Sequence, residues 1–466
     1  MTETHPDKLP FGVKFGYGAA DGSGSLIWTN LYVFFLYFLT DVVKLNPATA
    51  GLIIMVGTIW DAITDPMMGI WSDRTRCKYG RRRPFIIAAV LPYAVFSWLL
   101  FTDFGFSPGW NTIYFMIVVM FFFTSLTAMW VPYFSLAAEM TQDYDERTSL
   151  TSYKSGWSQV ASLAGAGTAL ILAQYFTKVF ESPRMGWSAM AAVFGLATMF
   201  PILLTWRVTR GYELFPERTD YRIRDVVVAT LKNRPFRYTI GSYVLGLVAL
   251  NIAGAVMVYF MTYYMGFNED QSSVAFLILF GCTVFWIPAI NYVSSRWGKR
   301  WALMGFLGAW AVVMGLGTLL VEPGEVIVFY VLMALAAGGV VAISLLGFAM
   351  ITDTVEVDEF HTGQRREGIY FGVATFFQKV ATAAAVGVNG LVLNLVGYVP
   401  DRAQSDTALW GIRLLLSEGV ALFLVLSIIV CYLMPMTREK HERLRQAIAH
   451  RREGREGDLS GLDGVI

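Results

Sequence analysis

The chain has 466 residues, of which 55% are hydrophobic and 15% are aromatic, but only 15% are charged. A soluble domain is usually about 25% charged, so this composition excludes an ordinary soluble globular protein. The net charge of +1 says little by itself, because the distribution of charge along the chain is what matters here.

Apolar stretches long enough to cross a bilayer recur along the whole chain. A spanning helix needs about 20 mostly apolar residues, and its backbone polar groups must be satisfied within the segment. The sequence therefore predicts an all-α membrane protein. The twelve expected spans lie at about 14–40, 47–72, 84–103, 111–140, 150–177, 187–208, 236–266, 271–295, 301–321, 325–352, 367–397 and 411–434.

Lysine and arginine lie mostly on one side of these spans. If the N-terminus is cytoplasmic, 30 of the 36 Lys and Arg residues fall in cytoplasmic segments, 5 fall on the opposite side, and Lys379 lies inside a span. Cytoplasmic loops of membrane proteins carry such an excess. We therefore expect an integral protein of the cell membrane with both termini in the cytoplasm.

The chain divides into two similar halves. The loop after the second span, Lys78–Arg82, and the loop after the eighth, Arg296–Arg300, share a basic–aromatic–Gly–basic–basic pattern, for which coincidental positive-inside charge is the alternative. Transporters built from such repeats bind their solutes near the midplane. We predict an N-terminal six-helix bundle at 1–208, a cytoplasmic linker at 209–235, a C-terminal six-helix bundle at 236–436 and a cytoplasmic tail at 437–466.

The loops also predict ion-pair latches on the cytoplasmic side. Basic side chains at span ends would pair with acidic loop residues, such as those of the acidic loop Asp353–Glu367, when that side is closed. This is a structural and gating role. The residues expected to take part are Asp73, Arg81, Arg82, Arg147, Arg300, Arg365 and Glu367.

Two carboxylates lie inside the second span, where an ionisable residue is costly unless it faces a cavity or a partner. Asp61 and Asp65 are four residues apart, so both side chains project from one helix face. A cation or a proton between them would relieve their repulsion, and Thr64 with nearby carbonyls would complete an oxygen shell. A solvated pair at the end of the span is the alternative.

The eleventh span carries Gln378 and Lys379 well inside its apolar stretch. A lysine near the midplane needs a carboxylate partner, and Asp61 and Asp65 are the candidates across the interface between the halves. Snorkelling of the lysine to the membrane surface is the alternative.

Aromatic and polar side chains inside the spans predict a sugar cavity, because sugar hydroxyls need polar partners in a mostly apolar pocket and sugar rings stack on aromatic faces. Trp28 and Trp130 are candidates for stacking, with helix packing as the alternative. Asp21, in a glycine-rich part of the first span, would line the cavity or cap a broken helix.

The sequence contains no nucleotide-binding loop and no catalytic triad, and its three cysteines lie far apart. An ATP-driven pump would need a phosphate-binding module. We therefore expect a transporter rather than an enzyme, with no cofactor apart from a coupling cation. Its partners would be a small-molecule substrate and the lipid bilayer, not nucleic acid.

Short motifs spread over nearly the whole chain resemble one family, the glycoside–pentoside–hexuronide:cation symporters (melibiose permease-like) of the major facilitator superfamily. The resemblance implies twelve helices in two pseudo-symmetric six-helix bundles with alternating access. The motifs are Phe38-Leu39-Thr40-Asp41-Val42-Val43, Trp60-Asp61-Ala62-Ile63-Thr64-Asp65-Pro66, Tyr79-Gly80-Arg81-Arg82-Arg83-Pro84, Val131-Pro132-Tyr133-Phe134-Ser135-Leu136, Thr362-Gly363-Gln364-Arg365-Arg366-Glu367-Gly368, Gln378-Lys379 and Gly397-Tyr398-Val399-Pro400.

The same resemblance implies site residues. Asp61 and Asp65 match the paired cation-site aspartates of the family, Lys379 matches a lysine near them, and Thr375 matches a polar position of that site.

The chain departs from the family pattern where melibiose permease-like members place two sugar-contacting carboxylates. It has Ser25 and Trp130 at those positions, with Asp21 one turn before Ser25, and Lys154 falls near a family arginine at the substrate cavity. A cationic cavity with few carboxylates would suit an anionic sugar such as a hexuronide, whereas Trp130 would offer a stacking surface to a neutral glycoside.

We therefore expect a secondary transporter that couples Na⁺ or H⁺ to a sugar or glycoside, each ligand raising the affinity for the other. The alternatives are a cation-coupled transporter of lysophospholipid or another non-sugar solute on the same fold, and a membrane sensor that does not transport. The expected substrate-binding residues are Asp21, Ser25, Trp28, Trp130, Lys154, Thr375, Gln378 and Lys379.

Overall fold

The structure is a computed structural model that describes residues 8–77, 80–141, 144–212, 230–362, 367–400 and 402–452, together with Leu462 and Val465. Twelve helices in this part of the chain are long and apolar enough to cross a membrane. They confirm the all-α membrane fold. The expected spans agree with them within a few residues, except for the tenth.

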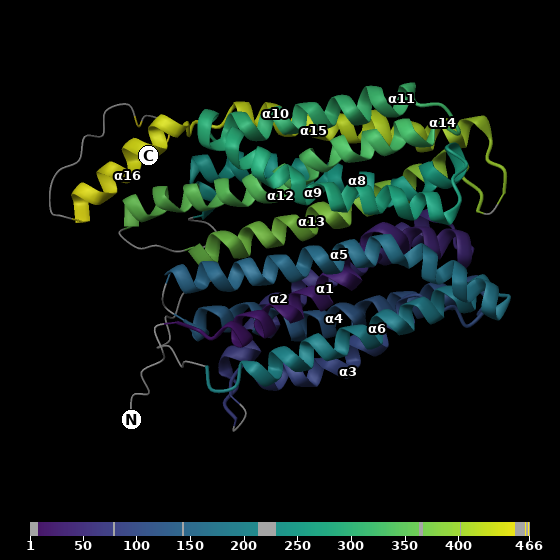
Figure 1. The fold of residues 1–466 in the computed structure, drawn as a ribbon, viewed down its shortest axis with the longest axis horizontal. Coiled ribbons are helices and arrows are strands. Elements are labelled where there is room, and N and C mark those ends of the chain that lie inside the picture. The colour runs from purple at the N-terminus through teal and green to yellow at the C-terminus, as the bar shows by residue number, and fades with distance from the viewer. Residues whose placement is uncertain are drawn as a thin grey trace. The chain divides into compact units, whose positions relative to one another are not determined.

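The first six spans form α1 to α6, which lie lengthwise alongside one another (Figure 1). α1 packs against α5 and α6, α3 packs against α4 and α6, and α2 packs against α4. The helices are α1 (Phe11–Tyr37), α2 (Pro47–Arg74), α3 (Arg83–Leu100), α4 (Pro108–Met140), α5 (Tyr144–Phe180) and α6 (Pro183–Val208).

The second half contains the remaining spans and a helix in the tail. Single π-helical turns follow α1 and α8, and two more join α10 to α11 and α14 to α15. The helices are α8 (Arg234–Tyr259), α9 (Glu269–Trp297), α10 (Lys299–Val312), α11 (Thr318–Leu320), α12 (Val326–Thr362), α13 (Glu367–Leu395), α14 (Asp406–Leu414), α15 (Val420–Tyr432) and α16 (Arg438–Arg452).

Contacts divide the chain into two compact units, each built from segments that are distant in sequence. Unit 1 comprises Met1–Arg218, Gly254–Phe280 and Val386–Gly411, and unit 2 comprises Thr219–Ala253, Gly281–Ala385 and Ile412–Ile466. The division into bundles at 1–208 and 236–436 stays a prediction.

Consecutive spans of unit 1 alternate in direction. The start of α1 and the α2–α3 and α4–α5 connections therefore lie at one end of unit 1, named here the basic end. The α1–α2, α3–α4 and α5–α6 connections lie at the opposite end, named the far end.

Glycines on α1 allow α5 to approach closely. A Cβ at Gly18 would lie 2.9 Å from the backbone of Tyr153, and a Cβ at Gly22 would lie 3.2 Å from the carbonyl oxygen of Trp157. Small residues let helix backbones come together in a membrane, where packing rather than hydrophobic burial drives association. This contact fixes the neighbouring Lys154 of α5 beside α1.

The structure corrects the expected loop at Asp353–Glu367. α12 continues to Thr362, so Asp353 and His361, both expected in a loop, are helical. α16 packs against α12. The start of the tail forms the helix α16.

Candidate cation and substrate sites

Asp61 and Asp65 project from α2 toward one threonine of α4. The hydroxyl oxygen of Thr127 lies 2.8 Å from Oδ1 of Asp61 and 3.0 Å from Oδ1 of Asp65. Thr64 joins this cluster, because its hydroxyl lies 3.3 Å from that of Thr127 and donates to the Asp61 carbonyl at 3.2 Å. Three of the residues predicted to bind a cation therefore come together around a residue that the sequence analysis missed.

The cluster lies in a buried part of the α2–α4 interface. Asp61 is only 2% exposed, whereas Asp65 is half-buried. The indole N–H of Trp60 donates to the Thr124 hydroxyl at 2.9 Å. This bond holds α2 against α4 one helical turn before Thr127. A hydroxyl carries one proton, so Thr127 donates to one carboxylate at a time. Approach of the second carboxylate to the same oxygen becomes favourable when a cation or proton is shared there.

The aromatic residues predicted to stack on a sugar form one row. The rings of Trp28 on α1 and Trp130 on α4 are 5.4 Å apart, and Phe134 continues the row 5.5 Å from Trp130. A Cβ at Gly24 would lie 2.2 Å from the Trp130 ring, so a glycine is required where that indole crosses α1. Tyr32 continues the row at its other end, with its ring centre 4.6 Å from that of Trp28.

Charged and polar side chains border the aromatic row. The ammonium of Lys154 lies 3.9 Å from Asp21 and 4.3 Å from the centre of the Phe134 ring. Asp21 is 6% exposed, and α1 is continuous from Phe11 to Tyr37, so of the two alternatives for Asp21 the cap of a broken helix is wrong. Ser25 lies 2.6 Å from Ser158 of α5, hydroxyl to hydroxyl.

The remaining predicted substrate and cation residues lie on α13, in unit 2. Thr375 donates to the Phe371 carbonyl at 2.9 Å, and Gln378 accepts a hydrogen bond from the Tyr243 hydroxyl at 3.3 Å. Lys379 is half-buried on the same helix. Its pairing with Asp61 and Asp65 stays a prediction.

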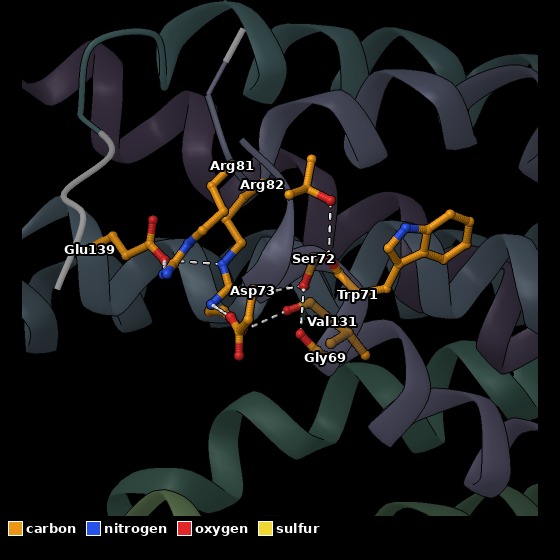
Figure 2. A network of polar contacts seen from close by, with 10 residues as sticks. Gly69, Trp71, Ser72, Asp73, Arg81, Arg82, Val131 and Glu139 are labelled. Atoms are coloured by element: carbon orange, nitrogen blue, oxygen red, sulfur yellow. Dashed lines mark hydrogen bonds and ion pairs between the residues drawn. The ribbon is translucent and has the colours of Figure 1, made fainter. Parts of the chain in front are cut away.

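Three of the predicted latch residues meet at the basic end of unit 1 (Figure 2). Arg82 pairs with Asp73 at 2.5 Å and with Glu139 at 3.0 Å, and Arg81 also pairs with Glu139. Arg82 further donates to the Ser72 hydroxyl at 2.8 Å. Because Arg82 is 6% exposed, these partners compensate a charge that would be costly to bury alone.

The other predicted latch residues are placed separately. Arg300 donates to the Tyr432 carbonyl, whereas its neighbour Lys299 pairs with Asp353 at 2.6 Å. Arg147 lies in the first turn of α5, Glu367 begins α13, and Arg365 lies outside the described residues.

Known sequences match this chain over almost its full length. Residues 16–438 match the family described as MFS/sugar transport protein. An uncharacterized symporter of Synechocystis sp. is 30% identical, with 96% of this chain and 98% of that protein covered. The isoprimeverose transporter of Lactiplantibacillus pentosus is 24% identical over 88% of this chain and 85% of its own length.

Solved transporter structures share the fold. A mutant of the nucleoside transporter NupG superimposes with a TM-score of 0.64 at 13% identity, covering 91% of this chain and 98% of its own. A bacterial homologue of the human drug peptide transporters PepT1 and PepT2 has a TM-score of 0.66 at 13% identity, covering 92% and 99%. From the family match, the chain belongs to the MFS/sugar transport protein family and is a membrane transporter rather than an enzyme.

Proposed function

We propose that the chain is a symporter that uses a gradient of Na⁺ or H⁺ to accumulate a sugar or glycoside. The observation that carries this proposal is the convergence of Asp61 and Asp65 on the Thr127 hydroxyl, at 2.8 and 3.0 Å, within membrane-spanning helices. Two carboxylates sharing one donor form a place where a cation or proton is bound and released. The isoprimeverose transporter among the relatives supports a sugar as the solute rather than a lysophospholipid.

The coupling follows from the position of the two clusters. Thr127 of the cation cluster and Trp130 of the aromatic row lie three residues apart on α4, so they share one face of that helix. A cation that neutralises the carboxylates would therefore change the electrostatic and packing environment of the aromatic row. Thermodynamic linkage then requires that bound substrate raises cation affinity by the same factor.

The charges within unit 1 favour a neutral solute. Lys154 lies 3.9 Å from Asp21, so the positive charge beside Trp130 is accompanied by a negative one. A neutral sugar can donate hydroxyl protons to the carboxylate and accept from the ammonium while its ring stacks on the indole. The pair carries no net charge and so offers an anionic sugar no excess positive charge, and we propose a neutral glycoside as the preferred class.

The basic end is proposed to face the cytoplasm, because 30 of the 36 Lys and Arg residues fall on that side of the spans. The protein would then lie in the cell membrane with both termini inside.

Uptake into vesicles with imposed ion gradients tests the proposal. Vesicles containing the protein would be offered neutral glycosides, uronates and lysophospholipids under a Na⁺ or a pH gradient. We expect accumulation of a neutral glycoside above its external concentration with one of the two gradients. Accumulation of lysophospholipid alone would contradict the sugar assignment, and accumulation of uronates in preference to glycosides would contradict the assignment of a neutral solute.

A further inference from the structure

The two halves of the chain carry the same backbone device at the far end. After α1 the helix widens into one π-helical turn at Phe38–Val42, and after α8 it widens into one at Phe260–Tyr264. Each turn is followed by a residue of positive φ, Lys44 at 67° and Gly266 at 69°. The matching residues are Phe38 and Phe260, Leu39 and Met261, Thr40 and Thr262, and Asp41 and Tyr263.

The backbone hydrogen bonds of the two turns also correspond. The N–H of Val43 donates to the Phe38 carbonyl at 3.0 Å, and that of Met265 donates to the Phe260 carbonyl at 2.9 Å. The two π-helical turns therefore match in backbone structure as well as in sequence. It places Asp41 and Tyr263 at equivalent positions of the two halves.

Asp41 collects hydroxyl donors from both halves. Its Oδ1 accepts from the Tyr398 hydroxyl at 2.6 Å and also from the hydroxyl of Tyr263, and its Oδ2 accepts from Thr40 at 2.6 Å. The Thr40 hydroxyl in turn lies 2.7 Å from that of Tyr259. Asp41 is 7% exposed, so these donors replace the water that a carboxylate would otherwise bind.

Tyr398 is suited to remain a donor. Burial and the neighbouring Asp41 carboxylate raise the pKa of Tyr398 above its usual range, so the phenol keeps its proton. Its ring also packs edge-on against Tyr259 and Tyr263, with centres 5.2 and 5.4 Å away.

Close backbone packing accompanies these bonds in unit 1. A Cβ at Gly51 of α2 would lie 3.1 Å from Cα of Gly390 on α13, and Asn46 donates to Asn394 at 2.6 Å. A cavity of about 520 Å³, lined by Lys44, Arg184, Trp187 and Glu269 among others, reaches Asp41. Asp41 thus stands where this cavity meets the packed helix ends.

We propose that Asp41 is the central acceptor of a gate at the far end, formed with Tyr263, Tyr398 and the Tyr259–Thr40 pair. The inference rests on the proposed transport by alternating access, because a solute that enters between the two halves requires these bonds to break. The gate uses neutral hydroxyl donors to one carboxylate, in contrast to the ion pairs of Arg82 at the basic end. When the gate opens, neutral hydroxyl groups lose their partners and are hydrated. This costs less free energy than separating the two charges of a buried ion pair.

The labelling rate of a single thiol, measured from each side of the membrane, tests the proposed gate. Cys77, Cys282 and Cys431 would be replaced by serine, and Ser25→Cys would place one thiol beside the aromatic row. A membrane-impermeant maleimide would then be applied from the far side or from the basic side. The gate variants are Tyr263→Phe and Tyr398→Phe, and the control is Tyr114→Phe, whose hydroxyl donates to the Leu99 carbonyl at the same end.

We expect each gate variant to be labelled about tenfold faster from the far side, because one hydrogen bond to a charge is lost from the closed state only. Labelling from the basic side should slow down in the same variants, which general destabilisation would not produce. Rates equal to those of Tyr114→Phe on both sides would overturn the proposal. The assay contains neither sugar nor an ion gradient, so its outcome is independent of the solute assignment.

Discussion

Asp61 and Asp65 approach the same hydroxyl oxygen, that of Thr127, at 2.8 and 3.0 Å. Their spacing of one helical turn explains why both carboxylates face α4, and the single hydroxyl proton explains why the pair is poised to take up a positive charge.

Thr127 provides the first prediction. Thr127→Val keeps the shape of the side chain but removes the hydroxyl, and a hydrogen bond to a charged group contributes about 1.5–3 kcal/mol. We expect the ion concentration for half-maximal transport to rise about tenfold to hundredfold. Thr127→Ser, which retains the hydroxyl, should stay near the parent value. Equal ion dependence of the valine and serine variants would show that Thr127 does not contribute to the cation site.

The Asp21–Lys154 pair provides the second prediction. Lys154→Met leaves the buried Asp21 carboxylate without its ammonium partner, and the partial exposure of the lysine reduces the expected loss to about 1–3 kcal/mol of unfolding free energy. The double variant Asp21→Asn/Lys154→Met should recover most of that loss. Thermal unfolding in detergent measures both variants, and additive losses in the double variant would contradict the pairing.

The latch at the basic end provides the third prediction. The Glu139 side chain is 4% exposed and pairs with Arg81 and Arg82, whereas the Asp73 side chain is 54% exposed. We expect Glu139→Gln to lower the unfolding free energy by about 2–4 kcal/mol and Asp73→Asn by less than about 1 kcal/mol. The same thermal measurement compares them. A larger loss in Asp73→Asn would mean that burial does not set the strength of this latch.

The spans and the acidic pair could be predicted because both carry strong signals in the sequence. Uninterrupted apolar length identifies the helices, and a carboxylate inside such a stretch is costly enough to stand out. Thr127 could not be found in this way, because a threonine can bond to its own helix and therefore causes no visible conflict in an apolar stretch.

Other features depended on the three-dimensional arrangement. The sequence indicated that basic loops would meet acidic ones, but geometry decides that Lys299 rather than Arg300 contacts Asp353. The far-end repeat did carry a signal, since Phe38–Asp41 and Phe260–Tyr263 are similar in sequence. The π-helical turns that bring Asp41 to the tyrosines have no signature of their own.

Sugar-triggered ion entry into vesicles tests the central claim most directly. A neutral glycoside would be added without an ion gradient while separate probes follow Na⁺ and pH inside vesicles that contain the parent protein, Asp61→Asn or Asp103→Asn. Asp103 is a matched control, because it is a buried carboxylate that pairs with Arg184 outside the cation cluster, at 2.9 Å. We predict that the glycoside drives one ion inward in the parent and in Asp103→Asn but not in Asp61→Asn. Glycoside entry with no ion movement in the parent, or unchanged ion movement in Asp61→Asn, would contradict the account.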